Sequence, residues 1–353
     1  MTLLPVVAVL ILVALWLLPR SSGQSKTLVV YCAHDAVYAD QILKDFERQT
    51  GIHVDVRYDT EATKSLGLIN LIVQEQTEPR CDVFWNNELL GTVDLKSQGL
   101  LEPYKGSSWE RLPEKYRDVE GYWVGFGARL RVIVVNSGRI TADYPAVQKL
   151  IDQDARRAAV AKPLFGTTLT HYTVLWHAWG PERLKKWHRE LRARGLREVN
   201  GNGPVKDIVA AGACDVGLTD TDDVFVAIDD QLPVGMLPVR VETLLDDQAP
   251  PSGLSDHGER SRTICVPNTA AIIRGTKRQG AARKLVDYLA SAETELALAR
   301  SRSRQIPLGA VDATQLPAEV QRMKDWAADG VDLRPLLPAR RECLEWLKSE
   351  YVK

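Results

Sequence analysis

The sequence predicts an α/β protein built from two units, each with a mainly parallel sheet flanked by helices. A length of 353 residues suggests roughly two domains. From Thr27 onward, short apolar strands alternate with amphipathic helices, which requires crossover connections and parallel strands. The chain leaves the first unit near Gly127–Arg131 and returns to it near residue 262. We therefore expect a discontinuous first unit and two chain crossings that can act as a hinge.

The N-terminus indicates export. Val6–Leu18 is wholly apolar, which is short for a membrane span but suits a signal-peptide core, and small residues follow at Ser21–Gly23. No Lys or Arg precedes the apolar run and Arg20 follows it, so an uncleaved anchor through residues 3–18 stays open. We expect residues 1–23 to be a signal peptide or an anchor, and the protein to be periplasmic or extracellular.

The first unit opens with a β-α-β-α-β pattern. Its expected elements are strand Thr27–Tyr31, helix Val37–Gln49, strand Ile52–Tyr58, helix Glu61–Gln76 and strand Cys81–Trp85. The segments after the three strands contain Asp35, Glu61 and Asn86. Because loops after parallel strands meet at one edge of the sheet, these polar groups are expected to converge on a ligand site.

Two further strands, Tyr122–Phe126 and Leu130–Val135, are expected at the first crossing. Alternation places Arg129 and Arg131 on the same face. Such an arginine can bind an anion or a carboxylate through two hydrogen bonds, although a surface pair is the alternative.

The second unit is expected to be mostly helical between its strands. A hydroxyl-rich turn, Lys162–His171, leads into the helical pattern Tyr172–Ala178, and backbone amides at such a helix start can hold an anion. The other expected helices are Ala146–Arg157, Pro181–Arg194 and Pro204–Ala211.

The segment Asp215–Val224 is a short buried strand that runs into Asp220, Asp222 and Asp223. Carboxylates this close repel one another unless a positive group lies between them or water solvates them. A hard cation is one interpretation. The other is an acidic first turn for a helix over Val224–Ile228, which the helix dipole favours.

The chain then returns to the first unit. A loop over Leu244–Arg260 precedes strand Thr263–Val266 and helix Gln279–Ala290, and two terminal helices are expected at Ala318–Ala328 and Ala339–Ser349. The expected domains are 26–128 with about 262–310, then 129–261, and a helical tail, 311–353, that packs on both.

Cysteine spacing and charge exclude several classes of protein. The five cysteines contain no Cys-x-x-Cys pair, which argues against a zinc ribbon or a thioredoxin-like site. A disulfide between Cys214 and Cys265 is conceivable, but buried thiols are the favoured interpretation. The formal net charge is -1 and no basic stripe occurs, so we expect no nucleic-acid partner.

From Thr27 to about Leu308 the chain resembles the bacterial extracellular (periplasmic) solute-binding proteins of ABC importers, family 1, in the ferric-iron-binding branch. The resemblance rests on strings in family order: Val29–Cys32, Phe46–Ile52, Asp82–Trp85, Gly99–Tyr104, Gly127–Arg131, Val132–Asn136, Val216–Thr219 and Ile306–Leu308. It implies a two-lobed periplasmic-binding-protein-like fold of type II, with a cleft and hinge between the lobes. It also implies a monomer, not an enzyme, that captures ferric iron or another hard cation, with a synergistic anion, for an inner-membrane permease.

The resemblance also implies a site, with one departure. The branch places two adjacent metal-binding tyrosines where this chain has Asp222 and Asp223. Asp35 matches the histidine ligand after the first strand, with His34 one place off. Glu61 matches the acidic ligand, and Arg129 the arginine that holds the anion. The expected metal ligands are Asp35, Glu61, Asp222 and Asp223, and the expected ligand site also includes Asn86, Arg129, Thr168 and Asp220. Aspartate keeps a hard anionic oxygen but loses the match of phenolate to ferric iron, so the identity of the metal stays open.

Other functions remain open at the level of sequence. The same fold could bind a polyamine through the acidic cluster, or an organophosphate through Arg129 and Thr167–Thr170, or serve as an anchored sensor. Asp220-x-Asp222 after a strand is similar to the nucleophile motif of haloacid-dehalogenase-type phosphohydrolases. That motif needs a later Gly-Asp-x-x-x-Asp partner, which does not follow Val224.

Overall fold

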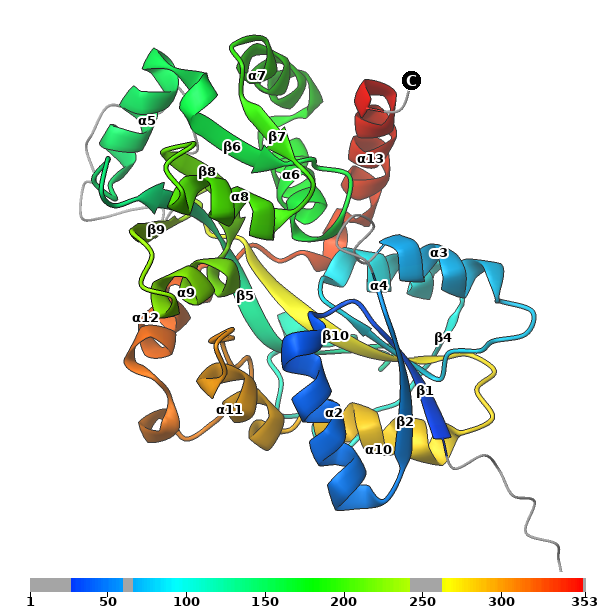
Figure 1. Ribbon diagram of the computed structural model, residues 1–353. Helices are drawn as coiled ribbons and strands as arrows, with labels where there is room; N and C mark the ends of the chain where they lie inside the picture. The colour runs from blue at the N-terminus through cyan, green and yellow to red at the C-terminus, as the bar shows by residue number, and fades with distance from the viewer. Residues whose placement is uncertain (1–26, 60–65, 242–261, 352–353) are drawn as a thin grey trace, which may run out of the picture.

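A computed structural model describes residues 27–59, 66–241 and 262–351 of the chain, and it has a two-lobed α/β fold (Figure 1). The expected signal peptide or anchor, the expected ligand Glu61 and the expected loop Leu244–Arg260 lie outside these residues. In the part of the chain that is described, no helix combines the length and the apolar character needed to cross a membrane.

Lobe 1 is the part built on the strands of the first unit. Its sheet has the order β2-β1-β3-β10-β5, with β4 paired to β10. β1 is parallel to β2 and β3, as the crossover pattern predicts, whereas β10 is antiparallel to β3 and β5. The strands are β1 Thr27–Cys32, β2 His53–Tyr58, β3 Val83–Asn86, β4 Leu101–Glu102 and β10 Cys265–Ile273.

The helices of lobe 1 cover this sheet with their apolar faces. In α2, for example, Ala39, Ile42, Leu43 and Phe46 are buried and recur at helical spacing. The helices are α2 Ala36–Thr50, α3 Leu66–Gln74, α4 Leu89–Ser97, α10 Gln279–Leu289 and α11 Ala292–Arg300.

The longest strand, β5 (Val124–Asn136), belongs to both lobes. All thirteen of its residues are buried. Its first half pairs with β10 and its second half with β8 and β9, so β5 and β10 run side by side where the lobes join (Figure 1). The expectation of two strands, Tyr122–Phe126 and Leu130–Val135, was wrong. Gly127 takes a φ of 44°, a conformation open to glycine, and the register with β10 shifts opposite it, so the strand bends instead of ending.

Lobe 2 is the part built on the second half of β5. There β8 is antiparallel to β5 and parallel to β6, and β7 is parallel to β6. The strands are β6 Ala158–Ala161, β7 Arg197–Val199, β8 Val216–Asp220 and β9 Val234–Pro238. The helices are α5 Tyr144–Gln153, α6 Gly166–Trp179, α7 Pro181–Ala193, α8 Asn202–Ala210 and α9 Thr221–Asp229.

The C-terminal helices α12 (Ala318–Ala328) and α13 (Leu337–Tyr351) follow both lobes, and α13 touches each of them. On lobe 2, Trp176 Nε1 of α6 donates to Glu342 Oε2 at 3.2 Å. On lobe 1, Arg341 Nη2 donates to Asp94 Oδ1 of α4 at 2.6 Å. Figure 1 shows α13 beside α6 and above α4. The terminal helix therefore connects the two lobes on one side of the molecule.

All five cysteines are buried free thiols. The conceivable disulfide between Cys214 and Cys265 is therefore wrong, because Cys214 lies in lobe 2 before β8 whereas Cys265 begins β10 at the junction. The interpretation of the cysteines as small buried side chains is confirmed.

Candidate functional site

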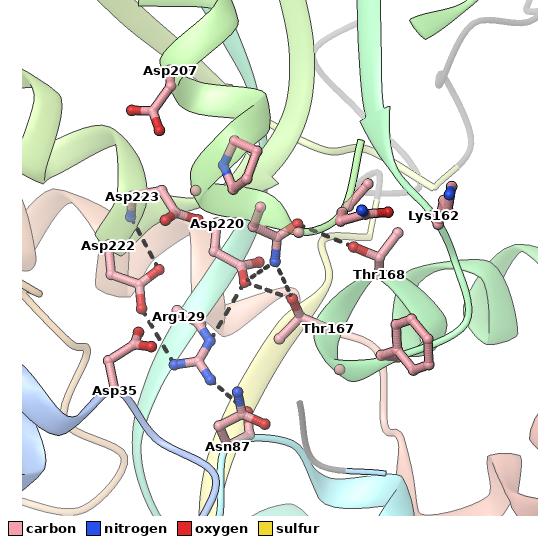
Figure 2. A pocket seen from close by; sticks show the side chains of 18 of the residues that line it. Asp35, Asn87, Arg129, Lys162, Thr167, Thr168, Asp207, Asp220, Asp222 and Asp223 are labelled. Carbon is pink, nitrogen blue, oxygen red and sulfur yellow. Dashed lines mark hydrogen bonds and ion pairs between the residues drawn. The ribbon is translucent and has the colours of Figure 1, made fainter. Parts of the chain in front are cut away.

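A cavity of about 350 Å³ lies between the lobes, at the carboxyl ends of several strands. Lobe 1 contributes the segments after β1 and β3, and lobe 2 contributes the starts of α6, α8 and α9 (Figure 2). Its polar and charged lining comprises Asp35, Tyr38, Asn87, Arg129, Lys162, Thr167, Thr168, Asn200, Asn202, Asp207, Asp220, Asp222 and Asp223. The cavity has the position at which open α/β sheets bind ligands.

The acidic cluster sits at the turn from β8 into α9. Asp220 is the last residue of β8, and Asp222 and Asp223 occupy the first turn of α9. One oxygen from each of the three lies within 4.8 Å of the others. The amide end of the helix partly offsets the repulsion among them. The two sequence interpretations, a cation site and an acidic first helical turn, thus describe the same residues.

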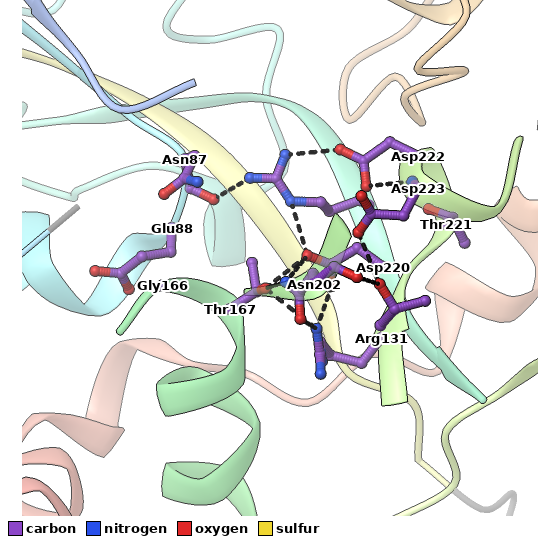
Figure 3. Close-up of polar contacts among 12 residues, drawn as sticks. Asn87, Glu88, Arg131, Gly166, Thr167, Asn202, Asp220, Thr221, Asp222 and Asp223 are labelled. Carbon is purple, nitrogen blue, oxygen red and sulfur yellow. Dashed lines mark hydrogen bonds and ion pairs between the residues drawn. The ribbon is translucent and has the colours of Figure 1, made fainter. Parts of the chain in front are cut away.

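Asp220 organises the cluster because both of its oxygens are engaged by protein groups. Oδ1 accepts from Arg131 Nη1 at 2.8 Å, and Oδ2 accepts from Thr167 Oγ1 at 2.6 Å and from Asn202 Nδ2 at 3.0 Å (Figure 3). These contacts tie β8 to the starts of α6 and α8. Asp220 therefore fixes the geometry of the cavity wall.

Arg129 lies between the lobes at the same wall. Its Nη1 is 3.3 Å from Asp222 Oδ2, its Nε is 3.6 Å from Asp220 Oδ2, and its Nη2 donates to the backbone oxygen of Asn87 at 2.6 Å (Figure 2). Burial lowers the pKa of the guanidinium, but the charges of Asp222 and Asp220 outweigh burial and leave that pKa raised. Arg129 thus balances the charge of the cluster, one of the two roles expected for it.

The carboxyl of Asp223 has a raised pKa, which favours its protonated form. Burial raises the pKa of its carboxyl well above the ordinary value, and the charges of Asp222 and Asp220 raise it further. Its Oδ2 accepts from Thr219 Oγ1 at 2.7 Å. A cation bound here would take the place of that proton.

The starts of α6 and α8 meet on the lobe 2 side of the cavity. α6 begins earlier than the sequence suggests, at Gly166, so the expected turn over Lys162–His171 is already helical in its second half. Thr168 Oγ1 donates to Asn202 Oδ1 at 3.0 Å and joins the two helix starts. Amides at two helix starts offer a place for an oxyanion beside the acidic cluster.

Most of the expected ligand residues line this one cavity. Those that do are Asp35, Arg129, Thr168, Asp220, Asp222 and Asp223. Asn86 does not: its amide nitrogen lies within 3.4 Å of Glu88 Oε1 and 3.2 Å of Thr92 Oγ1, in the interior of lobe 1. His34 is also interior, stacked on Trp85 with ring centroids 5.5 Å apart.

Several lining residues were missed by sequence reasoning. Asn87 takes the place expected for Asn86, because β3 continues through Asn86 and successive residues face opposite ways. The run Asn200–Pro204, rich in glycine before a helix, was the available signal for Asn202. Lys162 opens the hydroxyl-rich turn that the sequence indicated as an anion site, although its side chain was not singled out, and no signal in the sequence pointed to Tyr38.

Comparison with known proteins places the chain in a family. The family model for bacterial extracellular solute-binding proteins matches residues 28–301. The iron uptake protein A2 of Synechocystis sp. is 24% identical over 282 residues, which are 78% of this chain and 76% of that protein.

Two solved structures share the fold. Iron-bound HitA from Pseudomonas aeruginosa has a TM-score of 0.68 and 22% identity, over 90% of this chain and 99% of its own. The periplasmic binding protein AfuA from Actinobacillus pleuropneumoniae, with exogenous fructose-6-phosphate bound, has a TM-score of 0.71 and 17% identity, over 92% of this chain and 99% of its own. At these identities the structures establish the two-lobed fold alone. The family model spans most of the chain, and the chain therefore belongs to the bacterial extracellular solute-binding proteins.

Proposed function

We propose that this protein is the substrate-binding component of an ABC importer and that it captures a hard metal cation, with ferric iron as the first choice. It would work in the periplasm or outside the cell, free or anchored through residues 3–18. As a monomer it would deliver its cargo to an inner-membrane permease without catalysing a reaction.

The observation that carries the proposal is the charge of the cavity. Five aspartates line it, against one arginine and one lysine. Asp220 is held by Arg131, Thr167 and Asn202, and Asp207 pairs with Lys206. The carboxylates we assign to the cargo are therefore the other three, Asp35, Asp222 and Asp223. Carboxylate oxygens are hard ligands that suit a hard cation.

Two further points complete the proposed site. Glu61 stays a proposed ligand from lobe 1, on the family resemblance. The amides at the starts of α6 and α8 would hold a small oxyanion that fills the remaining metal positions, with Thr168 beside it. Arg129 would then tune the charge of the carboxylates, since its guanidinium already contacts Asp220 and Asp222.

The relatives support the choice of iron. The similar protein from Synechocystis sp. is named an iron uptake protein, and the similar structure of HitA is iron-bound. The departure at Asp222 and Asp223 leaves other hard cations as competitors, so the metal has to be measured.

The test is the metal content and affinity of the full-length protein purified without chelator. We expect iron in equimolar amount, and tighter binding of ferric citrate than of magnesium or calcium in calorimetric titration. Failure to bind ferric iron, in protein that unfolds cooperatively, would refute the assignment of the cargo.

A phosphorylated organic solute is the second candidate. It is favoured by the paired helix starts on the lobe 2 side of the cavity and by the likeness to AfuA with fructose-6-phosphate bound. Calorimetric titration separates the two candidates. If the cargo is a phosphorylated solute, a sugar phosphate should bind without metal, and if the cargo is a metal cation, a sugar phosphate should not bind. Spermidine tests the polyamine alternative, and magnesium-dependent release of phosphate from p-nitrophenyl phosphate tests the hydrolase alternative.

A further inference from the structure

Two arginines of lobe 1 hold the C-terminal end of a helix of lobe 2. Arg304 Nη2 and Nη1 donate to Asp229 Oδ1 and Oδ2 of α9, at 2.7 and 2.8 Å. Arg302 Nε lies 3.4 Å from the same carboxylate, and its Nη2 donates to Asp230. That Nη2 also lies 3.2 Å from the backbone oxygen of Val226, so the cation stands where the dipole of α9 favours it. We call the four charged side chains, of residues 229, 230, 302 and 304, the interlobe clamp.

The two arginines are firmly attached to lobe 1. They lie in the segment that follows α11, and Gln305 next to Arg304 accepts from Asn268 Nδ2 of β10 at 2.6 Å. Ile306 exchanges two backbone hydrogen bonds with Ala128 of β5, at 2.7 and 2.8 Å. The clamp therefore joins the lobes, and α9 lies on the opposite side of the molecule from α13, which joins them as well (Figure 1).

The backbone at Arg304 is unusual. Among the described residues, Arg304 and Gln231 are the only residues other than glycine with a positive φ, at 43° and 58°. Gln231 follows the end of α9, where helices often adopt this conformation. Arg304 lies in a loop, where a left-handed residue with a Cβ persists only if its surroundings enforce it. In this conformation its guanidinium reaches Asp229 and, through Nε at 2.7 Å, Glu319 of α12.

The clamp is charged and accessible to solvent, so salt should weaken it. The side chains of Arg304 and Asp229 are 21% and 24% exposed, and those of Arg302 and Asp230 are about half exposed. The hydrogen bonds from Arg304 hold the pKa of Asp229 below its ordinary value, so this carboxylate stays charged at neutral pH. An isolated exposed ion pair contributes little to stability, whereas a network with bidentate geometry contributes more.

We propose that Arg302 and Arg304 are positioning residues, which hold α9 against lobe 1 and thereby favour the arrangement of the lobes that takes up the cargo. For the cargo, this inference rests on the proposed function and deepens it. Helix α9 has nine residues, with Asp222 and Asp223 in its first turn and Asp229 at its end, so one short rigid element connects the clamp to the cavity.

The clamp would act through the equilibrium between lobe arrangements. A rotation of lobe 2 that carries α9 away from lobe 1 has to break the ion pairs of the clamp. The clamp would therefore raise the population of the arrangement in which both lobes can contact the cargo, and the apparent affinity rises with that population. Neither arginine needs to touch the cargo for this effect.

The experiment removes the clamp from either side in the full-length protein. One variant is Arg302→Gln with Arg304→Gln, and the other is Asp229→Asn with Asp230→Asn. Both lose the same ion pairs between the lobes, but their net charges change in opposite directions. A general electrostatic effect on a bound cation would strengthen binding in the first variant and weaken it in the second, whereas loss of the clamp weakens binding in both.

In calorimetric titration with ferric citrate, each variant should bind about threefold to tenfold more weakly than the wild type. The variant that combines all four changes should bind no more weakly than either pair, because both pairs remove one shared interaction. Raising the ionic strength from about 0.1 M to about 1 M, which shortens the Debye length from about 10 Å to about 3 Å, should bring the wild type close to the variants. In small-angle scattering without ligand, both variants should have a larger radius of gyration than the wild type.

The control is Arg48→Gln with Arg156→Gln. These exposed arginines pair with Asp45 and Asp154 inside a single lobe, so their loss changes the net charge as in the first variant and leaves the clamp intact. The control should match the wild type in affinity and in radius of gyration. Cooperative thermal unfolding would show that all the variants are folded.

The possible failures are distinguishable. Wild-type affinity in either clamp variant, or affinities that shift in opposite directions, overturns this inference and leaves the proposed function standing. If the wild type binds no ferric ion, the proposed function fails, and the radius of gyration of the ligand-free proteins decides about the clamp. A larger value in both variants then supports the hold of the clamp on the lobes, and values equal to that of the wild type overturn it.

Discussion

Arg129 and Asp222 form a buried ion pair, with 3.3 Å between Nη1 and Oδ2, on the wall of the cavity between the lobes. The same guanidinium also reaches Asp220 and the backbone of Asn87. The guanidinium of Arg129 thus contacts two carboxylates with different roles. We assign Asp222 to the cargo, and Asp220 supports the cavity wall. Arg129 offsets the negative charge of the cluster and would compete with a bound cation.

We expect Arg129→Met to destabilise the ligand-free protein by about 3–5 kcal/mol, because Asp222 and Asp220, both buried, each lose one cationic contact. The rise in melting temperature on adding ferric citrate should exceed that of the wild type, since the metal then supplies the missing charge. Thermal unfolding with and without ferric citrate measures both effects. Arg48→Met, at an exposed arginine, is the control. A ligand-free variant as stable as the wild type would contradict the role given to Arg129.

The double variant Asp222→Ala with Asp223→Ala should weaken ferric binding at least tenfold, which is about 1.4 kcal/mol. Its ligand-free form should unfold at an unchanged or higher temperature, because relief of repulsion within the cluster offsets the loss of the Arg129–Asp222 pair, and Arg129 keeps its contact with Asp220. Calorimetric titration and thermal unfolding check the two parts. Asp152→Ala with Asp230→Ala removes the same charge from exposed positions and should leave affinity intact. Wild-type affinity in the folded cluster variant would remove these aspartates from the site.

Stability should fall as the pH is lowered through the titration of His188. This buried histidine is hydrogen-bonded to Tyr172 and Tyr351, at 3.0 and 3.2 Å, where α13 packs on α6 and α7. Burial lowers its pKa from 6.5 to about 4, and the charge of Arg192 acts in the same direction. The folded protein therefore binds fewer protons than the unfolded chain between these values, so stability is present above pH 6.5 and is lost towards pH 4.

Denaturant unfolding from pH 7.5 to pH 4 measures this loss. The His188→Gln variant should lack the contribution of this residue to the pH dependence. A plot of the free energy of unfolding against pH should therefore have a smaller slope for the variant than for the wild type between pH 6.5 and 4. Parallel curves for variant and wild type would show that His188 does not govern the docking of α13.

Binding should draw the lobes together as nearly rigid bodies. The proposed ligands come from both lobes, and the lobes already touch where Thr170 Oγ1 of α6 lies 3.3 Å from Glu88 Oε2. Small-angle scattering of the full-length protein should show a smaller radius of gyration with saturating ferric citrate. The Asp222 and Asp223 double variant should show no change. An identical scattering profile for the loaded and empty wild type would exclude a mechanism based on closure.

The sequence predicts the regular parts of the fold well. The β-α-β-α-β start of lobe 1 matches β1, α2, β2, α3 and β3 where the structure describes it. The four longer elements show a hydrophobic pattern, and the four-residue β3 was indicated by apolar residues without alternation, as in a fully buried strand. Strands β6, β7 and β9 were not expected, since three to five residues leave no room for a pattern. Their strand character comes from pairing with neighbours distant in the sequence, and local propensity contributes little.

The site was predictable where carboxylates follow a buried strand, and less so elsewhere. Asp220, Asp222 and Asp223 share a turn, so a single segment indicated them. Asn87 and Asn86 differ by one place, and only the end of β3 decides which of them faces the cavity. The presence of Tyr38 in the cavity lining depends on how α2 is oriented relative to the other lobe. The helical period in the sequence does not contain that information.

The thirteen buried residues of β5 have a mechanical consequence for the site. Any rotation of one lobe against the other has to be absorbed by this strand and by β10 beside it, close to Gly127. Arg129 and Arg131 lie two and four residues beyond that glycine, so such a rotation would move them little compared with residues at the far ends of the lobes. Their positive charges would then stay near the axis of rotation, and opening would mainly change the distance between the oxygens that the two lobes contribute.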